Sequence, residues 1–349
     1  MEIEDPISGR IVLRRGSLAD LAREIERLSP QGALVLADRG IEDSWLPHVE
    51  GALYGAGVEH VVMRMGGESC KSLEWARAAW EAMANMGLGR KSATVGVGGG
   101  AVCDLAGFVA STYMRGTLLA LVPTTLLAQV DASIGGKNGV NLTGKNLVGT
   151  FYRPDLVLID PDTLSTLPRE EMASGLAEVV KCGVACDPRL FSLVESVGAG
   201  LLDPSREELD LVIQRAVAAK VSVVRRDWRD LGPRMRLNLG HTVGHAIEAV
   251  SGYSIRHGHA VAIGLVAACR VAERLLGFEH AERVERLLAR LGLPTGLPLP
   301  PGEVVRAALL DKKSWLGRLA MVLPEDLGSA TVRRVPEEVL LEVLEGMAN

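Results

Sequence analysis

The chain has 349 residues, 48% of them hydrophobic, a formal net charge of −5 and a pI near 5.9. This length and apolar content favour two domains, each with its own core. No acidic or basic block interrupts the sequence, which argues against binding to the nucleic-acid backbone, and no apolar run reaches the roughly 18 residues of a membrane helix. Because acidic residues also crowd the N-terminus, we expect no signal peptide, a cytoplasmic location and a small-molecule partner.

Short apolar segments alternate with helical patterns in the first part of the chain. The predicted strands are residues 33–37, 59–63, 93–97, 118–122 and 156–159. After Asp160 the pattern changes, and apolar residues recur at three- and four-residue steps from about residues 169, 188, 206, 237, 260, 281, 302 and 336. We therefore predict an α/β protein with a Rossmann-like parallel sheet over residues 1–160 and an all-α domain over residues 161–349.

A glycine-rich turn, Gly98 to Gly100, follows one predicted strand and leads into a helix. Glycine lets backbone amides close on a diphosphate, and a helix N-terminus adds partial positive charge. The turn is not a regular G-x-G-x-x-G pattern, so a plain tight turn is the alternative. Asp38 at the end of an earlier strand can accept from ribose hydroxyls, and the charged run 67–71 ends another strand. Together these features favour a nucleotide site.

Hydroxyls, cations and glycines gather in the next segment of the chain. Arg115, Thr124, Thr125 and Asp131 precede two glycine-lysine pairs, Gly136 with Lys137 and Gly144 with Lys145, and Asn146 follows the second pair. Lysine supplies a point charge, and neighbouring glycines allow close approach to an anion. The hypothesis is a phosphorylated substrate, and the alternative is a flexible basic loop.

Four of the seven histidines lie within nineteen residues, at His241, His245, His257 and His259. Histidines four apart on a helix share one face and can reach one site. A catalytic zinc ion takes three protein ligands, and Glu178, an acid in an apolar helical stretch, is the candidate carboxylate. Spacing alone does not say which histidines coordinate a metal and which handle protons.

Three motifs carry a specific resemblance: residues 107–116, 123–128 and 238–248. Through them the chain resembles the 3-dehydroquinate synthase family of sugar phosphate cyclases, from about Asp38 to Leu323. The resemblance implies an NAD- and metal-dependent lyase that converts 3-deoxy-D-arabino-heptulosonate 7-phosphate to 3-dehydroquinate and phosphate in the shikimate pathway of aromatic amino acid biosynthesis. It also implies a homodimer and a divalent metal, Zn²⁺ in the first place and Co²⁺ as an alternative.

The resemblance also implies roles for individual positions. Metal ligands would be Glu178, His241 and His257. Catalytic residues would be His245, Lys137, Asn146, Lys181, Arg115, Lys220, Arg234 and Asp230. Further substrate contacts would be Asp131, Asn238, Lys312 and Lys313. NAD contacts would be Asp38, Glu68, Lys71, Gly99, Gly100, Asp104, Thr124, Thr125, Lys145, Thr163, Leu164 and Thr166.

The sequence departs from the family pattern at three places, one of which is the loop between Lys137 and Lys145, one residue shorter than in some relatives. Asp230 stands in for a longer glutamate, and His259 follows Gly258 where glutamate is common, so that His259 could compete for metal or support a ligand. The rival functions are a metal-dependent polyol dehydrogenase, a related cyclase that makes a cyclitol precursor, and a noncatalytic NAD-binding protein. Arg115, Lys220 and Arg234 together favour a substrate with a carboxylate.

Overall fold

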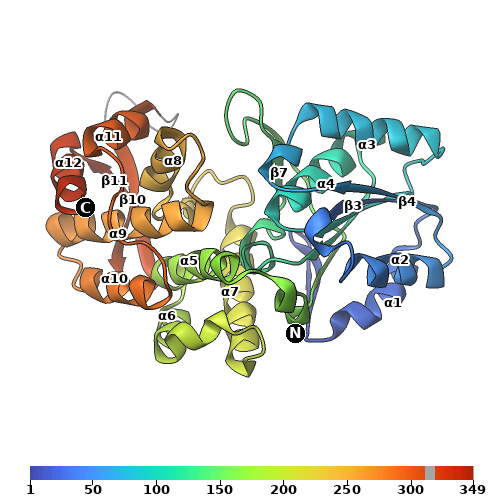
Figure 1. The fold of residues 1–349 in the computed structure, drawn as a ribbon, viewed down its shortest axis with the longest axis horizontal. Helices are drawn as coiled ribbons and strands as arrows, with labels where there is room; N and C mark the ends of the chain where they lie inside the picture. Colours follow the sequence, from blue (N-terminus) through green and yellow to red (C-terminus); the bar gives the residue numbers. More distant parts are fainter. Residues whose placement is uncertain (311–318, 349) are drawn as a thin grey trace. The chain divides into compact units, whose positions relative to one another are not determined.

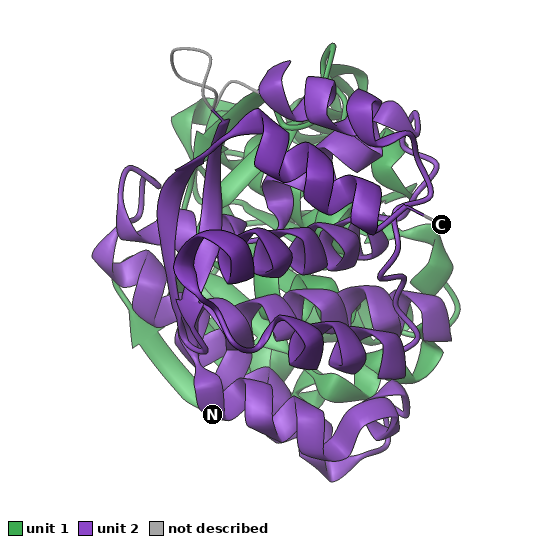
Figure 2. Ribbon diagram, turned by 90° about the vertical axis from the view of Figure 1, so that its left-hand side faces the viewer, with its two compact units in different colours: residues 1–168 green, residues 169–349 purple. Residues whose placement is uncertain are grey.

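The computed structural model describes residues 1–310 and 319–348, and it divides the chain into two compact units, Met1–Pro168 and Arg169–Asn349 (Figure 2). The division falls later than the predicted boundary at Asp160. The short helix η6 (Pro161–Thr166) belongs to the first unit because that unit binds it. Gln129 Nε2 donates to the Asp160 carbonyl at 2.9 Å, and Trp45 Nε1 donates to Thr166 Oγ1 at 2.9 Å.

The first unit is built on a seven-stranded sheet with the order β1-β2-β9-β6-β5-β3-β4. Its strands are β1 (Glu2–Asp5), β2 (Gly9–Leu13), β3 (Ala33–Asp38), β4 (His60–Met65), β5 (Ala93–Gly98), β6 (Leu118–Pro123) and β9 (Leu156–Ile159). Only β1 pairs antiparallel; every other pair is parallel. A separate antiparallel pair is formed by β7 (Lys137–Val140) and β8 (Val148–Phe151). The five predicted strands are thus confirmed.

Helices cover both faces of this sheet, which explains its continuous apolar strands. The helices α1 (Leu21–Leu28) and α2 (Leu46–Gly55) lie on one face, and α3 (Leu73–Asn85) and α4 (Gly100–Thr112) on the other (Figure 1). Strands buried on two faces need no polar alternation, and every residue of β5 and β9 is buried. Because β3, β4, β5, β6 and β9 run parallel, their carboxyl ends meet along one edge of the sheet.

The second unit is mostly helical, as predicted. It contains α5 (Arg169–Cys186), α6 (Pro188–Val197), η7 (Gly198–Leu202), α7 (Glu207–Arg226), η8 (Pro233–Asn238), α8 (His241–Val250), α9 (His257–Leu276), α10 (Ala281–Arg290), α11 (Pro301–Leu310) and α12 (Glu337–Gly346). The prediction that this domain is all-α omitted an antiparallel hairpin, β10 (Leu319–Asp326) with β11 (Ser329–Val335). The hairpin forms because β10 buries an apolar face against α9 and Gly328, at φ 85°, permits its tight turn.

The helix α9 is the centre of the second unit, packed against α5, α8, α10 and α12. Its contact with α5 is very close at Gly258, where a Cβ atom would lie 2.3 Å from both the carbonyl oxygen and the Oγ of Ser174. Only glycine fits there, and the Gly258 amide donates to Ser174 Oγ at 3.1 Å. None of the described helices combines the length and hydropathy that a membrane span requires.

Candidate functional site

Three helices of the second unit bring one carboxylate and two imidazoles together. Glu178 lies in the middle of α5, while His241 and His257 are the first residues of α8 and α9. One ligand atom from each residue lies within 4.8 Å of the other two. The structure therefore assembles the three side chains that the sequence singled out as metal ligands.

Hydrogen bonds aim both imidazoles at the same carboxylate oxygen. His241 Nδ1 lies 3.2 Å from the Leu239 carbonyl, and its Nε2 lies 3.6 Å from Glu178 Oε1. His257 Nδ1 lies 3.3 Å from Glu248 Oε2, and its Nε2 lies 3.2 Å from Glu178 Oε1. In each ring Nδ1 is hydrogen-bonded to an oxygen on the side away from Glu178, and Nε2 faces the Glu178 carboxylate.

Burial and charge perturb all three groups. Burial alone would raise the pKa of Glu178, but the ammonium of Lys181 beside it and the two imidazoles hold that pKa well below its usual range. Burial lowers the pKa of His241 to about 3, against the opposing charge of Glu178. Burial also disfavours a charge on His257, yet hydrogen bonds to Glu178 and Glu248 outweigh it and raise that pKa to about 10. The surroundings therefore disfavour a charge on His241 and favour one on His257.

His245 lies one helical turn after His241 on the same helix. Its ring centroid is 5.2 Å from that of His241 and 6.4 Å from that of His257. It is adjacent to the three-residue cluster without belonging to it, as is suitable for a proton-handling group. His259 also lies outside the cluster among the described residues.

Buried cations lie on elements that pack around α5. Lys181 is on α5, Lys220 on α7 and Arg234 on η8, all three are buried, and these three elements contact one another. Arg234 is fixed by its own loop: its Nη1 donates to the Trp228 carbonyl at 2.6 Å, and its amide donates to Asp227 Oδ2 at 3.1 Å. Such charges suit an anionic ligand.

The remaining predicted residues of the second unit differ in how far they can be placed. Asp230 adopts a left-handed conformation, φ 58°, in the loop before η8, and Asn238 ends η8. Lys312 and Lys313 lie outside the described residues.

In the first unit, the glycine turn lies against Asp38 at the common edge of the sheet. The backbone of Gly98 has φ 153°, and a Cβ atom there would lie 3.0 Å from the Cβ of Asp38. Gly99 caps α4, so the first amides of that helix lie at the turn, and the Thr124 amide donates to the Gly98 carbonyl at 2.9 Å. A carboxylate thus adjoins a helix N-terminus of the kind that binds diphosphates.

Lys71 connects two other predicted groups at this edge. Its buried ammonium donates to Asp104 Oδ2 at 2.7 Å and also to the side-chain oxygen of Asn146. Asn141, in the loop after β7, donates from its side-chain amide to Glu68 Oε1 at 2.9 Å. The side chains of Glu68 and Lys71 therefore both hold this loop. Asp104 and Asn146, which the sequence assigned to cofactor and to substrate, therefore share one cation.

Known proteins match the chain over nearly its whole length. The family model described as 3-dehydroquinate synthase N-terminal matches residues 61–174, and the C-terminal model matches residues 175–314. A 3-dehydroquinate synthase from Pyrococcus abyssi is 46% identical over 94% of this chain and 96% of its own. The chain belongs to the 3-dehydroquinate synthase family. It is an enzyme, and the prediction of a 3-dehydroquinate synthase is confirmed, whereas the dehydrogenase alternative is not favoured.

Solved structures of sugar phosphate cyclases share the whole fold. A 2-epi-5-epi-valiolone synthase from Streptomyces hygroscopicus subsp. jinggangensis, with NAD⁺ and Zn²⁺ bound, superposes with a TM-score of 0.90 at 28% identity, over 99% of this chain and 98% of that one. A 2-deoxy-scyllo-inosose synthase complexed with carbaglucose-6-phosphate, NAD⁺ and Co²⁺ has a TM-score of 0.90 at 26% identity, over 99% and 100%. The predicted fold class is confirmed.

For this synthase-family chain, several predicted positions turn out to have other side-chain contacts. Thr163 and Leu164 are fully buried, and the Thr163 hydroxyl donates to the Asp160 carbonyl at 2.8 Å, so neither residue is exposed to a ligand. Thr166 accepts from Trp45. Asp131 lies in the π-helix η5 (Ala128–Ala132), a distorted element that often marks functional sites. Arg115 and Lys137 are exposed, in η4 (Tyr113–Arg115) and at the start of β7.

Glu248 is the site residue that the sequence reasoning missed. It lies seven residues after His241 and three after His245, so the helical period places all three on one face of α8. The motif containing it was recognised, but no role was given to the acid.

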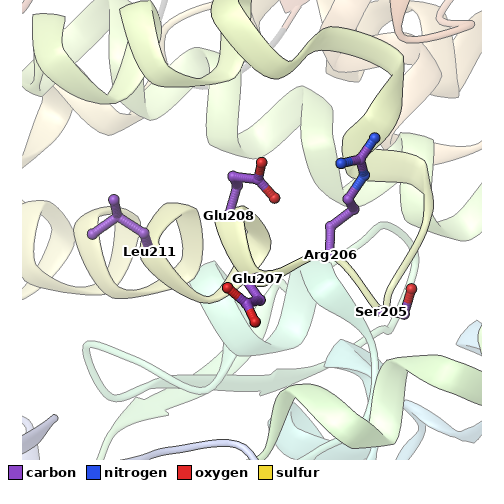
Figure 3. Close-up of a pocket in the computed structure, with 5 residues that line it drawn as sticks. All are labelled: Ser205, Arg206, Glu207, Glu208 and Leu211. Carbon is purple, nitrogen blue, oxygen red and sulfur yellow. The ribbon is translucent and has the colours of Figure 1, made fainter.

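A hollow elsewhere in the second unit does not compete with this site. It lies at the start of α7 and is lined by Ser205, Arg206, Glu207, Glu208 and Leu211 (Figure 3). Its lining mixes charges of both signs and contains none of the predicted site residues. The chemistry therefore points to the cluster around Glu178.

Proposed function

We propose that this member of the family converts 3-deoxy-D-arabino-heptulosonate 7-phosphate into 3-dehydroquinate and phosphate with bound NAD and one divalent metal ion. The observation that supports the proposal best is the set of Glu178 and His241, both buried, and the partly buried His257, whose ligand atoms lie within 4.8 Å of one another. It occurs in a chain whose relatives at 44–47% identity are named 3-dehydroquinate synthase.

The residues of the second unit fit a catalytic metal. Two imidazole nitrogens and one carboxylate oxygen are a donor set that zinc accepts, and three protein ligands leave a position for substrate. The same set accepts cobalt. We assign Glu178, His241 and His257 as the metal ligands.

The residues of the first unit fit NAD. Asp38, the glycine turn at Gly99 and Gly100, and Thr124 with Thr125 all follow the carboxyl ends of neighbouring parallel strands, where open α/β sheets bind nucleotides. We propose that the amides at the start of α4 hold the diphosphate and that Asp38 accepts from a ribose hydroxyl. The further NAD contacts proposed, from the family resemblance, are Glu68, Lys71, Asp104, Lys145, Thr163, Leu164 and Thr166.

When bound, NAD would take up and return a hydride at one substrate carbon, and the metal would polarise the hydroxyl on that carbon. The protein's own residues hold the rest of the substrate. We propose that Lys137 and Asn146 orient the phosphate so that its oxygen takes the neighbouring proton as it departs, and that His245 handles a proton at its imidazole. Lys220 and Arg234 neutralise the carboxylate.

The other proposed roles follow the family pattern at single positions. Arg115, Lys181 and Asp230 act in catalysis, and Asp131, Asn238 and the Lys312–Lys313 pair contact substrate. We also propose a homodimer, as the resemblance implied, and a cytoplasmic location; sedimentation of the purified enzyme checks the oligomeric state.

The decisive assay supplies the heptulosonate phosphate with catalytic NAD and follows free phosphate together with NADH absorbance. The synthase releases phosphate without lasting NADH, because the hydride returns within each turnover. Stoichiometric NADH from a simple polyol, without phosphate release, would refute the proposal.

Two variants separate the two parts of the site. His241→Ala should lose metal and turnover together, because it removes one of three ligands; His259→Ala, outside the cluster, is the matched control and should keep both. Lys137→Ala should keep its metal content but release phosphate slowly, which stopped-flow detection measures. A His241→Ala enzyme that retains metal would remove that ligand assignment.

A further inference from the structure

The carboxylate of Glu248 lies behind one of the two imidazoles at the cluster. Glu248 is 2% exposed, and its Oε2 lies 3.3 Å from Nδ1 of His257. It comes from α8, the helix that also carries His241, so one helix supplies an imidazole directly and supports the imidazole that comes from α9.

The two imidazoles are held in the same way by different acceptors. Nδ1 of His241 faces the neutral carbonyl of Leu239, whereas Nδ1 of His257 faces a carboxylate. In both rings this leaves Nε2 directed at Glu178 Oε1, at 3.6 and 3.2 Å. An imidazole that donates Nδ1–H to a carboxylate keeps one tautomer and one ring orientation, and its Nε2 becomes a stronger donor to a metal.

His257 needs such support more than His241 does. Its side chain is 32% exposed, against 11% for His241, so less packing restrains the ring. It also follows the turn at residues 251–256, where four of the six residues are exposed and the other two are partly buried. The hydrogen bond between Nδ1 and the buried carboxylate of Glu248 is the contact that holds the ring on the side away from Glu178.

We propose that Glu248 is a positioning residue that holds His257 with Nε2 aimed at the metal position, and so sets the affinity of the enzyme for its metal ion. The inference rests on the metal assignment of the proposed function. In this proposal Glu248 acts through His257.

The same residue also anchors the turn between α8 and α9, and this provides a control. The carbonyl of Glu248 accepts from the Tyr253 amide at 2.7 Å and from Ser251 Oγ at 3.0 Å. Ser251→Ala removes a turn contact of Glu248 and leaves its carboxylate in place. A loss that came only from the turn would appear in Ser251→Ala as well.

The test measures zinc affinity by competition with a chromogenic chelator for the wild type, Glu248→Ala, Glu248→Gln and Ser251→Ala. We expect Glu248→Ala to bind zinc about 10- to 100-fold more weakly. Glu248→Gln should fall between it and the wild type, because the amide oxygen still accepts from Nδ1–H but carries no charge. Ser251→Ala should match the wild type, and saturating zinc should restore most of the turnover of Glu248→Ala.

Two further measurements keep the result unambiguous. Thermal unfolding of each metal-free variant confirms that it is folded, and the visible spectrum of the Co²⁺-loaded enzyme should change in Glu248→Ala because the ring of His257 is reoriented. Zinc affinity in Glu248→Ala within twofold of the wild type would overturn the inference, as would an equal loss in Ser251→Ala. If His241→Ala keeps its metal, the proposed metal site itself fails; if only Glu248→Ala behaves as wild type, this inference alone fails.

Discussion

Replacing Gly258 by alanine tests how closely the metal cluster depends on helix packing. A Cβ atom at this position would lie 2.3 Å from the carbonyl oxygen of Ser174 and 2.5 Å from its Cα. Both are backbone atoms of α5, so no side-chain rotation relieves the overlap. Because Gly258 follows His257 and Ser174 lies one turn before Glu178, the helices α5 and α9 must separate at the point where they bring those two side chains together.

The size of the effect follows from the overlap. Ordinary contact begins near 3.4 Å, so the helices must part by about 1.1 Å (3.4 − 2.3). Metal–ligand distances tolerate only about 0.2 Å. Overpacking of this kind costs about 1–3 kcal/mol, and a unit of 181 residues (349 − 169 + 1) loses about 2–4 °C in Tm per kcal/mol, hence roughly 2–12 °C. Misplacement of a site residue by about 1 Å should lower turnover on the order of 100-fold.

Thermal unfolding with and without zinc, together with kcat, measures both effects for Gly258→Ala. Gly346→Ala is the matched control: Gly346 is also helical and in the same unit, but its Cβ would meet nothing within 4 Å. We expect it to leave Tm and turnover almost unchanged. A Gly258→Ala enzyme with the Tm and the turnover of the wild type would refute the argument from close packing.

Two further predictions concern buried charges in the first unit. Lys71→Met should lower the free energy of unfolding by about 1–3 kcal/mol and weaken NAD binding, because Asp104 loses its cation. Denaturant titration measures the stability, and NAD fluorescence measures the binding. The control Lys91→Met, at an exposed lysine, should change neither the stability nor the NAD binding. Glu24 has its pKa lowered chiefly by the hydrogen bond from Arg10, so its contribution to stability is complete above its unfolded pKa and disappears as pH falls through the lower folded value. The difference in unfolding free energy between the wild type and Glu24→Gln should therefore be largest at pH 7 and shrink below about pH 4.5, and a difference that stays constant with pH would contradict this.

Local patterns were enough to predict five of the seven strands of the sheet, but not β1 and β2. Strands such as β5 and β9 are buried on both faces, and a buried strand is a continuous apolar run that is visible without any knowledge of its neighbours. The hairpin β10–β11 was missed because β11 has few buried residues. Its residues Arg333 and Arg334 are exposed, so the strand shows no continuous apolar run.

The domain boundary shows the limit of such reading. Residues 161–166 look like the start of a helical region, but they belong to the first unit. Gln129 donates a hydrogen bond to the carbonyl of Asp160, and Trp45 donates one to the hydroxyl of Thr166. Neither partner is near them in the chain, so no local pattern could report the contact.

For this protein, then, the order of amino acids determined which residue types were present for chemistry: histidines four apart on one helix face, an acid in an apolar helix, and glycines after a strand. The folded structure decided which of them meet. Glu248 approaches His257 across a turn. Lys71 binds both Asp104 and Asn146, although Asn146 lies 75 residues after it in the chain. The physical reason is that periodicity acts within one element, whereas a ligand cluster depends on distances between elements, and these are set by packing such as that of Gly258 on Ser174.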